Sequence, residues 1–190
     1  MKVRQAGLPG VLLIEPEIFS DDRGFFFESF SAKYRDVPGM PGRFVQDNLS
    51  HSKKDVLRGL HLQHPNEQGK LVSVVSGRVL DVAVDVRAGS PTFGRYAAVE
   101  LDAIACRQLW IPRGFAHGFL VLSDQATFLY KCDAPYSRAD EIGIRWNDPE
   151  IGIEWPVHEP LLSAKDEAAP GLKDLMHRLP AYSCSHIYAD

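Results

Sequence analysis

Glycine and proline interrupt this chain too often for long helices to form. The 190 residues include 15 glycines and 13 prolines, and both residue types destabilise the interior of a helix. The segments between them are short, and in many of them apolar side chains alternate with polar ones, which is the period of a half-buried strand. Short strands that recur about every 8–12 residues are typical of a sandwich or barrel. The sequence therefore predicts an all-β fold.

The alternating runs define the strands that we expect. In the run 79–86, Asp81 and Asp85 alternate with apolar residues. Helical patterns are confined to Phe30–Tyr34, which is one turn long, and to Gly171–Arg178 near the C-terminus. The expected strands are Val11–Glu15, Phe25–Phe30, Phe44–Ser50, Val56–Gln63, Leu71–Val75, Arg78–Val86, Tyr96–Leu101, Arg107–Ile111, Gly118–Leu122, Thr127–Cys132 and Ile142–Trp146.

Turn residues between these strands suggest how the chain reverses direction. Ser76-Gly77 is expected to form a tight hairpin between its flanking strands, and Ser123-Asp124 to form a second turn. The length fits one domain, which we assign to residues 1–178. The stretch 179–190 is polar and weakly patterned, so we expect a loosely held tail.

The composition excludes several classes of protein. The formal net charge is −4 and the pI is about 6.0, whereas a general nucleic-acid-binding protein is usually basic. Cys106, Cys132 and Cys184 form no CxxC pair, which indicates a reducing compartment and neither a disulfide framework nor a zinc site. The first residues lack the apolar run of a signal peptide, and no stretch approaches the roughly 18 apolar residues of a membrane span. We therefore expect a soluble, cytoplasmic protein without a membrane partner.

The segment 58–64, Arg-Gly-Leu-His-Leu-Gln-His, concentrates side chains that bind anions and transfer protons. In an unbroken strand Arg58 and His61 point to opposite faces, because successive side chains alternate. A β-bulge at Gly59 would bring Arg58 round to the face of His61. A surface strand with scattered charges is the simpler interpretation of such a segment taken alone.

Lys70 and Tyr130 also stand on predicted strands. A lysine that opens a strand is usually solvated, but beside a histidine inside a barrel its charge can stabilise an oxyanion. A tyrosine on a strand usually packs against its neighbours, and a catalytic role requires a geometry that the sequence does not supply. Both residues are therefore candidates whose surroundings decide their role.

The segment 111–119 contains a Pro-x-Gly-x-x-His pattern, in which a turn delivers His117 into a strand. It is similar to a motif of cupin barrels, where this histidine faces the lumen and often binds a metal together with an H-x-H pair and a glutamate. The pair here is His61-x-x-His64, which cannot direct both rings to one face of an unbroken strand. We therefore expect no metal cofactor. The alternative is a metal site that uses these three histidines and Glu67.

Two further segments contain candidate residues. Asp166, in Ser-Ala-Lys-Asp, is either a solvated loop carboxylate or the partner that orients a histidine base. The segment 21–28 places three consecutive phenylalanines between Arg23 and Glu28. It is either a strand packed on a neighbour or a platform on which a nucleobase stacks.

Taken together, these segments resemble one family, the dTDP-4-dehydrorhamnose 3,5-epimerases. The similar strings run in order from about residue 5 to residue 172. Each is weak alone, but so many in order make a highly specific match. The strings are Asp-Asp-Arg-Gly-Phe-Phe-Phe-Glu (21–28), Phe-Val-Gln-Asp-Asn (44–48), Val-Leu-Arg-Gly-Leu-His-Leu-Gln (56–63), Gln-Gly-Lys-Leu-Val (68–72), Asp-Val-Ala-Val-Asp-Val-Arg (81–87), Ser-Pro-Thr-Phe-Gly (90–94), Trp-Ile-Pro-Arg-Gly-Phe-Ala-His-Gly-Phe (110–119), Phe-Leu-Tyr-Lys (128–131) and Ile-Gly-Ile-Glu-Trp-Pro (151–156).

The resemblance implies a cupin-type jelly roll, a homodimer and no metal cofactor. It also implies a substrate, dTDP-4-dehydro-6-deoxy-glucose, that is inverted at C3 and C5 of the sugar on the way to dTDP-rhamnose. By this resemblance His61 takes the place of the base and Asp166 that of the group that orients it. Lys70 resembles the lysine that stabilises the enolate, and Tyr130 takes the place of the acid on the opposite face of the ring.

A nucleotide site is implied in the same way. Arg23 and Glu28 would reach the nucleotide across the dimer interface, with Phe26 as a stacking partner. Leu62 departs from the family pattern, in which an aromatic residue is commoner, and this departure concerns sugar packing rather than the acid–base set. The residues that would line the sugar nucleotide are Gln46, Asn48, Arg58, His117, Glu141 and Lys165.

Three other functions are compatible with the sequence. A monofunctional 3- or 5-epimerase of a related deoxysugar pathway could use the same base. A metal-dependent cupin oxygenase or isomerase would use the alternative histidine set. A sugar- or nucleotide-binding module would bind dTDP without exchanging protons with solvent.

Overall fold

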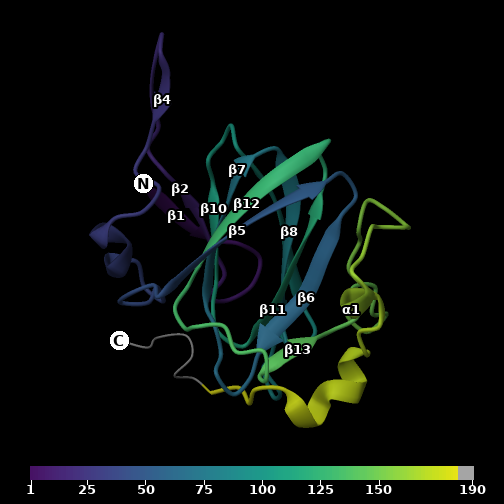
Figure 1. Cartoon of the computed structure of the whole chain (residues 1–190). Helices are drawn as coiled ribbons and strands as arrows, with labels where there is room; N and C mark the ends of the chain where they lie inside the picture. Colours follow the sequence, from purple (N-terminus) through teal and green to yellow (C-terminus); the bar gives the residue numbers. More distant parts are fainter. Residues whose placement is uncertain (184–190) are drawn as a thin grey trace.

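Two antiparallel β-sheets build the molecule, which we describe over residues 1–183 from a computed structural model (Figure 1). The first sheet has the strand order β1-β2-β10-β7-β12-β5, the second has the order β13-β6-β11-β8-β9, and β3 pairs with β4 in a separate hairpin. The predicted all-β fold is therefore confirmed. The strands are β1 (Lys2–Gln5), β2 (Leu12–Glu15), β3 (Phe19–Asp21), β4 (Gly24–Phe26), β5 (Gln46–Lys53), β6 (Leu57–Gln63), β7 (Lys70–Ser76), β8 (Arg78–Asp85), β9 (Tyr96–Asp102), β10 (Gln108–Ile111), β11 (Phe115–Val121), β12 (Gln125–Cys132) and β13 (Glu141–Gly143).

Apolar side chains from both sheets meet in the core between them, as in a jelly roll. Leu13 and Val72 come from the first sheet and Phe115 from the second, and all three are buried in one cluster. Phe119 of β11 stacks on Phe128 of β12 with ring centroids 4.2 Å apart. Burying a large apolar side chain contributes roughly 1.5–3 kcal/mol, so these contacts hold the two sheets together.

Ser76-Gly77 joins two strands that do not pair with each other, so the predicted hairpin is wrong. β7 lies in the first sheet and β8 in the second. Gly77 has a φ of +83°, and a Cβ there would lie 2.1 Å from the carbonyl oxygen of Gln125. Glycine is thus required for a corner between the sheets, which uses the same turn chemistry as a hairpin. The turn at Ser123-Asp124 also leads from one sheet to the other, from β11 to β12.

Three short helical segments lie within the described part of the chain, two of them in its C-terminal portion. The 3-10 helices η1 (Ala32–Asp36) and η2 (Leu172–Arg178) lie close to the two predicted helical patterns. The one-turn helix α1 (Ala164–Glu167) and the strands β1 and β3 are not predicted. Every residue of β1 and β3 is exposed. Neither strand therefore has a buried face, which is what produces the alternation of apolar and polar residues from which strands are predicted. Within residues 1–183 no helix is both long enough and apolar enough to cross a membrane.

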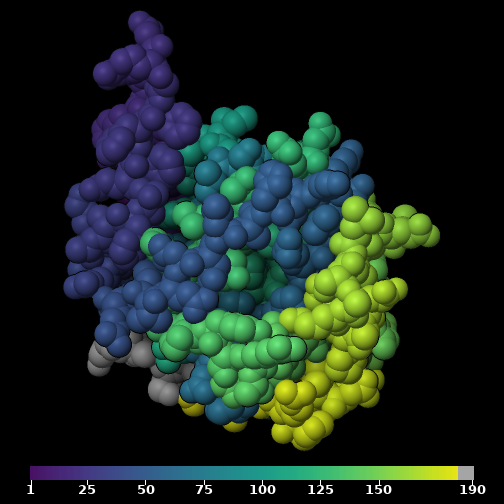
Figure 2. Space-filling model, viewed as in Figure 1, coloured from purple at the N-terminus to yellow at the C-terminus, as the bar shows by residue number. Residues whose placement is uncertain are grey.

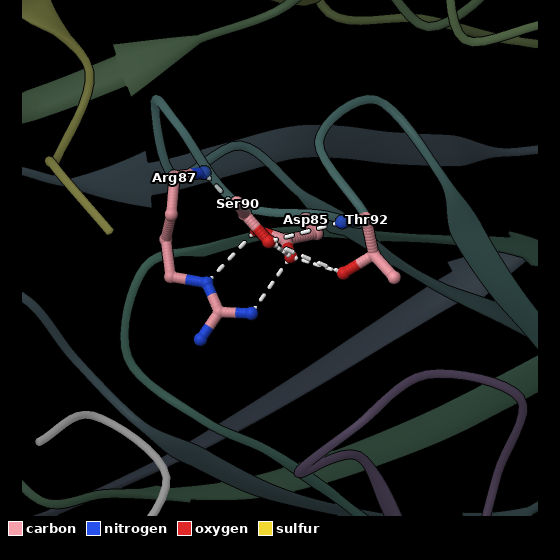
Figure 3. A network of polar contacts seen from close by, with 4 residues as sticks. All are labelled: Asp85, Arg87, Ser90 and Thr92. Carbon is pink, nitrogen blue, oxygen red and sulfur yellow. Dashed lines mark hydrogen bonds and ion pairs between the residues drawn. The ribbon is translucent and has the colours of Figure 1, made fainter. Parts of the chain in front are cut away.

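A buried polar network closes the end of β8 (Figure 3). Asp85 accepts hydrogen bonds from Nε and Nη2 of Arg87 at 2.8 and 2.7 Å. The hydroxyls of Ser90 and Thr92 donate to the same carboxylate at 2.6 Å each. Burial acts to raise the pKa of Asp85, but these donors outweigh it, and the pKa lies below its ordinary value. The network therefore holds an ionised carboxylate inside the protein.

The C-terminal segment is attached beside this network. The backbone N–H of Ala88 donates to the carbonyl of Pro180 at 2.7 Å, and its carbonyl accepts from the N–H of Tyr182 at 2.9 Å. Residues 184–190 of the expected tail lie outside the described residues. The division into a domain over 1–178 and a loosely held tail stays a prediction.

The hairpin of β3 and β4 projects from the body of the molecule (Figure 1, purple). We call residues 19–28 the arm. Phe19 and Phe26 of the arm are 57% and 65% exposed. The base of the arm is held to the first sheet, since Nε2 of Gln108 donates to the carbonyl of Ser29 at 2.8 Å. In a single chain the arm thus presents aromatic side chains to solvent.

Candidate active site

An open cavity of about 470 Å³ lies between the strands of both sheets and a C-terminal segment, residues 161–167, which we call the strap. Figure 2 shows the hollow on one face, between the blue segment that contains β5 and β6, the green segment after β12 and the yellow-green strap. A second cavity of about 340 Å³ adjoins the first. His61, Lys70 and Tyr130 line both cavities, whereas His117 and Asp166 line the first. The four candidate acid–base residues therefore converge, together with His117, which was predicted to line the sugar nucleotide.

A bulge in β6 brings Arg58 and His61 to the same cavity, which confirms the prediction made from the neighbouring glycine. On β11 the partner of Arg58 is Phe119 and the partner of His61 is His117, so β6 accommodates one extra residue between them. Gly59 has a φ of +114°, and a Cβ there would lie 2.6 Å from the backbone of β11. The close approach of the two backbones is thus what allows both side chains to line the cavity.

His61 is held by a buried carboxylate from the strap. Nε2 of His61 lies 2.6 Å from Oδ1 of Asp166, whose residue is only 4% exposed. Burial acts to raise the pKa of Asp166, but hydrogen bonds from His61 and Ser163 outweigh it, and the pKa lies below its ordinary value. An ionised Asp166 accepts a hydrogen bond from the Nε2–H of His61, which leaves Nδ1 as the basic nitrogen of the ring.

Lys70 and Tyr130 lie on adjacent strands, β7 and β12, next to this pair. Burial lowers the pKa of the Lys70 amine, although the nearby Cys132, Asp81 and Glu141 act against that shift. Burial raises the pKa of Tyr130. The cavity therefore contains an amine that is costly to keep charged and a phenol that keeps its proton.

A second histidine–carboxylate pair lies deeper in the barrel. Nε2 of His117 is 2.9 Å from Oδ2 of Asp81, and Asp81 is fully buried. Asp81 was not predicted to be a site residue. The sequence feature that could have indicated it is the position of this aspartate within the apolar run of β8. An aspartate that is buried in such a run requires a hydrogen-bond partner. His117 is thus fixed at the wall of the cavity.

The rim of the second cavity is a network around Glu141. Its two carboxylate oxygens accept hydrogen bonds from Nζ of Lys165 at 2.6 Å and from the hydroxyl of Tyr136 at 3.0 Å. Burial acts to raise the pKa of Glu141, but these partners outweigh it, so the pKa lies below its ordinary value. Tyr136 is a further lining residue that the sequence analysis missed, because it follows the strand in an irregular segment.

Polar side chains of β5 continue this rim. Gln46 and Asn48 line the second cavity, and Nε2 of Gln46 donates to Oδ1 of Asn48 at 2.9 Å. In the first cavity, Nε of Arg58 donates to the hydroxyl of Ser52 at 3.0 Å. This bond fixes the base of the guanidinium group and leaves its terminal nitrogens for an anion.

The predicted nucleotide contacts of the arm are not brought to these cavities within one chain. Arg23 pairs with Asp21 on the arm itself, and Glu28 pairs with Lys33 at 3.3 Å. Neither these residues nor Phe26 line either cavity. Their predicted contact across a dimer interface stays a prediction.

The alternative metal-ligand set is not assembled. Nδ1 of His64 lies 3.1 Å from Oε1 of Glu67, whereas His61 and His117 pair with the aspartates described above. Among the residues that the structure describes, no group of three or more histidine, cysteine, aspartate or glutamate side chains is arranged to hold a metal ion. Each of the three histidines thus pairs with a different carboxylate.

Known proteins resemble this chain over nearly its whole length. A family model described as dTDP-4-dehydrorhamnose 3,5-epimerase matches residues 5–174. An enzyme of that name from Shigella flexneri is 56% identical over 168 residues, which cover 87% of this chain and 93% of the relative.

Solved structures share the fold as well. A dTDP-6-deoxy-D-glucose-3,5-epimerase from Legionella pneumophila, in complex with dTDP-4-keto-L-rhamnose, superposes with a TM-score of 0.93 at 50% identity, covering 96% of this chain and 99% of that one. A 3'-monoepimerase from Streptomyces bikiniensis, in complex with dTDP-quinovose, gives a TM-score of 0.85 at 40% identity, covering 91% and 90%. Together with the converging acid–base residues, these matches show that the chain belongs to the dTDP-4-dehydrorhamnose 3,5-epimerase family.

Proposed function

We propose that this protein epimerises dTDP-4-dehydro-6-deoxy-D-glucose at C3 and C5 and so forms dTDP-4-dehydro-L-rhamnose. The observation that carries the proposal is the convergence of His61, Lys70 and Tyr130 in one cavity of a chain with this family membership. Both carbons are adjacent to the C4 ketone, so one set of acid–base groups can serve both.

In the proposed reaction His61 is the base. Nδ1 takes the proton from the carbon next to the ketone, and the electrons of the C–H bond form the enolate. Asp166 orients the ring and stabilises the imidazolium that results, since its carboxylate lies 2.6 Å from Nε2. A positioned general base typically accelerates such a step by about 10²–10⁴-fold.

Lys70 and Tyr130 complete the step. The Lys70 ammonium faces the C4 oxygen and is stabilised most when that oxygen becomes negative, so it lowers the barrier rather than the energy of the bound substrate. Tyr130 then donates its hydroxyl proton to the opposite face of the carbon. The configuration is inverted, His61 gives its proton to solvent, and Tyr130 recovers one from solvent.

The nucleotide would lie along the rim of the cavities. Arg58, Lys165 and the amides of Gln46 and Asn48 offer donors to the diphosphate, and arginine in particular suits such oxygens. His117 and Glu141 would contact the sugar nucleotide from the cavity walls. The net charge of −4 makes these local donors necessary.

We further propose that the enzyme is a homodimer in which the arm of one chain covers the cavity of the other. The exposed aromatic side chains of the arm support this arrangement, since such residues are enriched at interfaces. Arg23, Phe26 and Glu28 would then contact the nucleotide of the partner's site.

Isotope exchange tests the reaction. With enzyme and substrate in D₂O, we expect deuterium at both C3 and C5, because reprotonation draws on solvent. His61→Asn should abolish exchange and keep dTDP binding. Exchange at neither carbon in the wild type would contradict the proposal.

A 3-epimerase is the second candidate, and the similarity to the Streptomyces 3'-monoepimerase favours keeping it. The same experiment separates the two activities. Deuterium at C3 alone, with C5 unlabelled at long incubation, would identify the monofunctional reaction.

A further inference from the structure

The Asp166 carboxylate has a hydrogen-bond partner besides His61. The hydroxyl of Ser163 donates to Oδ2 of Asp166 at 2.8 Å, while Oδ1 faces His61 at 2.6 Å. The same hydroxyl oxygen accepts the backbone N–H of Asp166 at 3.1 Å. Each carboxylate oxygen therefore has its own side-chain partner, and rotation of the carboxylate would break both bonds.

The strap gives Ser163 a fixed position. Leu161, two residues earlier, is bonded to the start of β6: its N–H donates to the carbonyl of Asp55 at 2.8 Å, and its carbonyl accepts the N–H of Leu57 at 3.0 Å. His61 stands on the same strand. The strap is thus attached to the strand that carries His61, only two residues before Ser163. This attachment fixes the position of Ser163 relative to His61.

We propose that Ser163 is a positioning residue of the epimerisation, which holds the Asp166 carboxylate in the plane that directs Oδ1 at His61. The inference rests on the proposed function, because the orientation of His61 matters only if His61 is the base. In this arrangement Ser163, Asp166 and His61 form a relay in which each member fixes the next.

A simpler role for Ser163 is that of a helix cap. It is the N-cap of α1, and its hydroxyl accepts the N–H of Asp166 as N-cap residues do. A cap needs the hydroxyl only as an acceptor. The hydroxyl proton of Ser163 goes to a carboxylate that is 4% exposed, and a hydrogen bond to a buried charge contributes more than one between neutral groups.

Three substitutions separate the two roles. Ser163→Ala removes the cap and the donor. Ser163→Gly removes the donor but keeps the helix start, because glycine at an N-cap position costs only a few tenths of a kcal/mol. Ser163→Thr keeps both functions of the hydroxyl.

We expect kcat to fall about tenfold in the Ala and Gly variants, with KM changed less than about twofold. Loss of the donor raises the pKa of Asp166, so the acid limb of the kcat/KM profile should move to higher pH in both. Ser163→Thr should restore the wild-type rate and profile.

Ser123 provides a matched control. Its hydroxyl also accepts one backbone N–H, from Arg78 at 2.8 Å, and it donates to the carbonyl of Gln125 at 2.7 Å, with the carbonyl of Arg78 as a more distant acceptor at 3.4 Å. It lies at a corner between the sheets and lines neither cavity. Ser123→Ala should therefore lower the melting temperature and leave kcat and the pH profile unchanged.

The outcomes are distinct. If Ser163→Gly has wild-type kcat and an unmoved acid limb, the hydroxyl is only a cap and the proposal is wrong. The same conclusion follows if Ser163→Ala, like the Ser123 control, loses only thermal stability. If the wild type itself shows no exchange in D₂O, the proposed function fails, and this result is independent of the Ser163 variants.

Discussion

The pKa values of Lys70 and Tyr130 move in opposite directions, and both shifts suit a proton transfer around an enolate. Burial lowers the pKa of the Lys70 amine, so the ammonium gains most when a negative oxygen forms next to it. Burial raises the pKa of Tyr130, so the phenol is still protonated when the carbanion needs a proton. One physical cause, the loss of water, thus prepares both residues.

A pH profile tests this difference. Because its pKa is lowered from 10.5, the Lys70 amine should lose its charge and kcat/KM should fall at a pH below that value. Burial raises the pKa of Tyr130 above its ordinary value of 10.0, so its phenol loses its proton only above that pH. Lys70→Arg should be slower but should lack this basic limb, since arginine stays charged.

Stopped assays of the wild type and Lys70→Arg from pH 7 to pH 10.5 make the comparison. A wild-type profile that is flat across this range, or a basic limb that persists in the arginine variant, would assign the limb to another group.

At the scale of secondary-structure elements, the bulge in β6 is the feature on which the site depends. Gly59 combines a φ of +114° with a Cβ position that would clash with the backbone of β11 at 2.6 Å. Gly89 has a φ of +85° but nothing within 4 Å of its Cβ position. A substitution at Gly89 therefore tests backbone strain alone, whereas a substitution at Gly59 tests strain together with the close approach of two strands.

We expect Gly89→Ala to cost about 1–2 kcal/mol of unfolding free energy, the strain of a left-handed conformation. Gly59→Ala should cost at least about 3 kcal/mol, because overpacking adds to that strain, and it should lose exchange activity as Arg58 and His61 are displaced. For each variant, urea unfolding measures the free energy of unfolding, and deuterium exchange in D₂O measures the activity. Equal losses of stability would show that the backbones of β6 and β11 separate easily.

The network at the end of β8 predicts how stability depends on pH. The folded pKa of Asp85 lies below its ordinary value, so below about pH 4 the unfolded chain binds more protons than the folded one. This contribution is complete above that range and is lost as the pH falls towards the folded pKa.

Asp85→Asn should therefore destabilise the protein by roughly 3–5 kcal/mol at pH 7, since Arg87 is left buried without its partner. The difference from the wild type should narrow as the pH falls from 4 to 3. Urea midpoints at several pH values check this, and a difference that does not depend on pH would contradict it.

The elements differ in how far the sequence predicts them. The bulge was predictable because Gly59 stands between Arg58 and His61, a local pattern. The corner at Gly77 was not, because its turn residues fit a hairpin equally well and only the assembly of the sheets decides which strand pairs. Asp81 was missed for a related reason: alternation predicts a solvated face, whereas this face of β8 lies in the core between the two sheets, where Asp81 is fully buried beside His117.

The site shows the same limit. The pair of His61 and Asp166 joins residues 105 positions apart, and no local pattern relates them. The pair was predicted only from the family resemblance, and in the structure Nε2 of His61 lies 2.6 Å from Oδ1 of Asp166. In the sequence Ser163 is only the first residue of the segment Ser-Ala-Lys-Asp, and nothing there predicts its hydrogen bond to Asp166.

At the scale of the whole molecule, the proposed dimer makes a prediction about mixed subunits. Arg23→Ala should weaken substrate binding at both sites of its homodimer, and His61→Asn should abolish the reaction at both sites of its own. If the arm acts across the interface, a heterodimer of the two variants contains one intact site.

Unfolding and refolding an equal mixture of the two variants should thus restore activity towards about a quarter of the wild-type value at low substrate concentration, as expected when half of the dimers carry one good site. Each variant refolded alone is the control. A mixture no more active than the average of the two would place Arg23 in the site of its own chain.

The strap also has a consequence for the order in which the protein becomes active. The ribosome completes the strand that carries His61, the proposed base, long before it makes Asp166, the residue proposed to orient it, since 105 positions separate the two. A chain released before the strap is made would therefore contain the proposed base without the carboxylate that orients it, and it would also lack Lys165. Premature termination before the strap should therefore yield fragments without epimerase activity, because synthesis of the strap completes the proposed pair of base and orienting carboxylate.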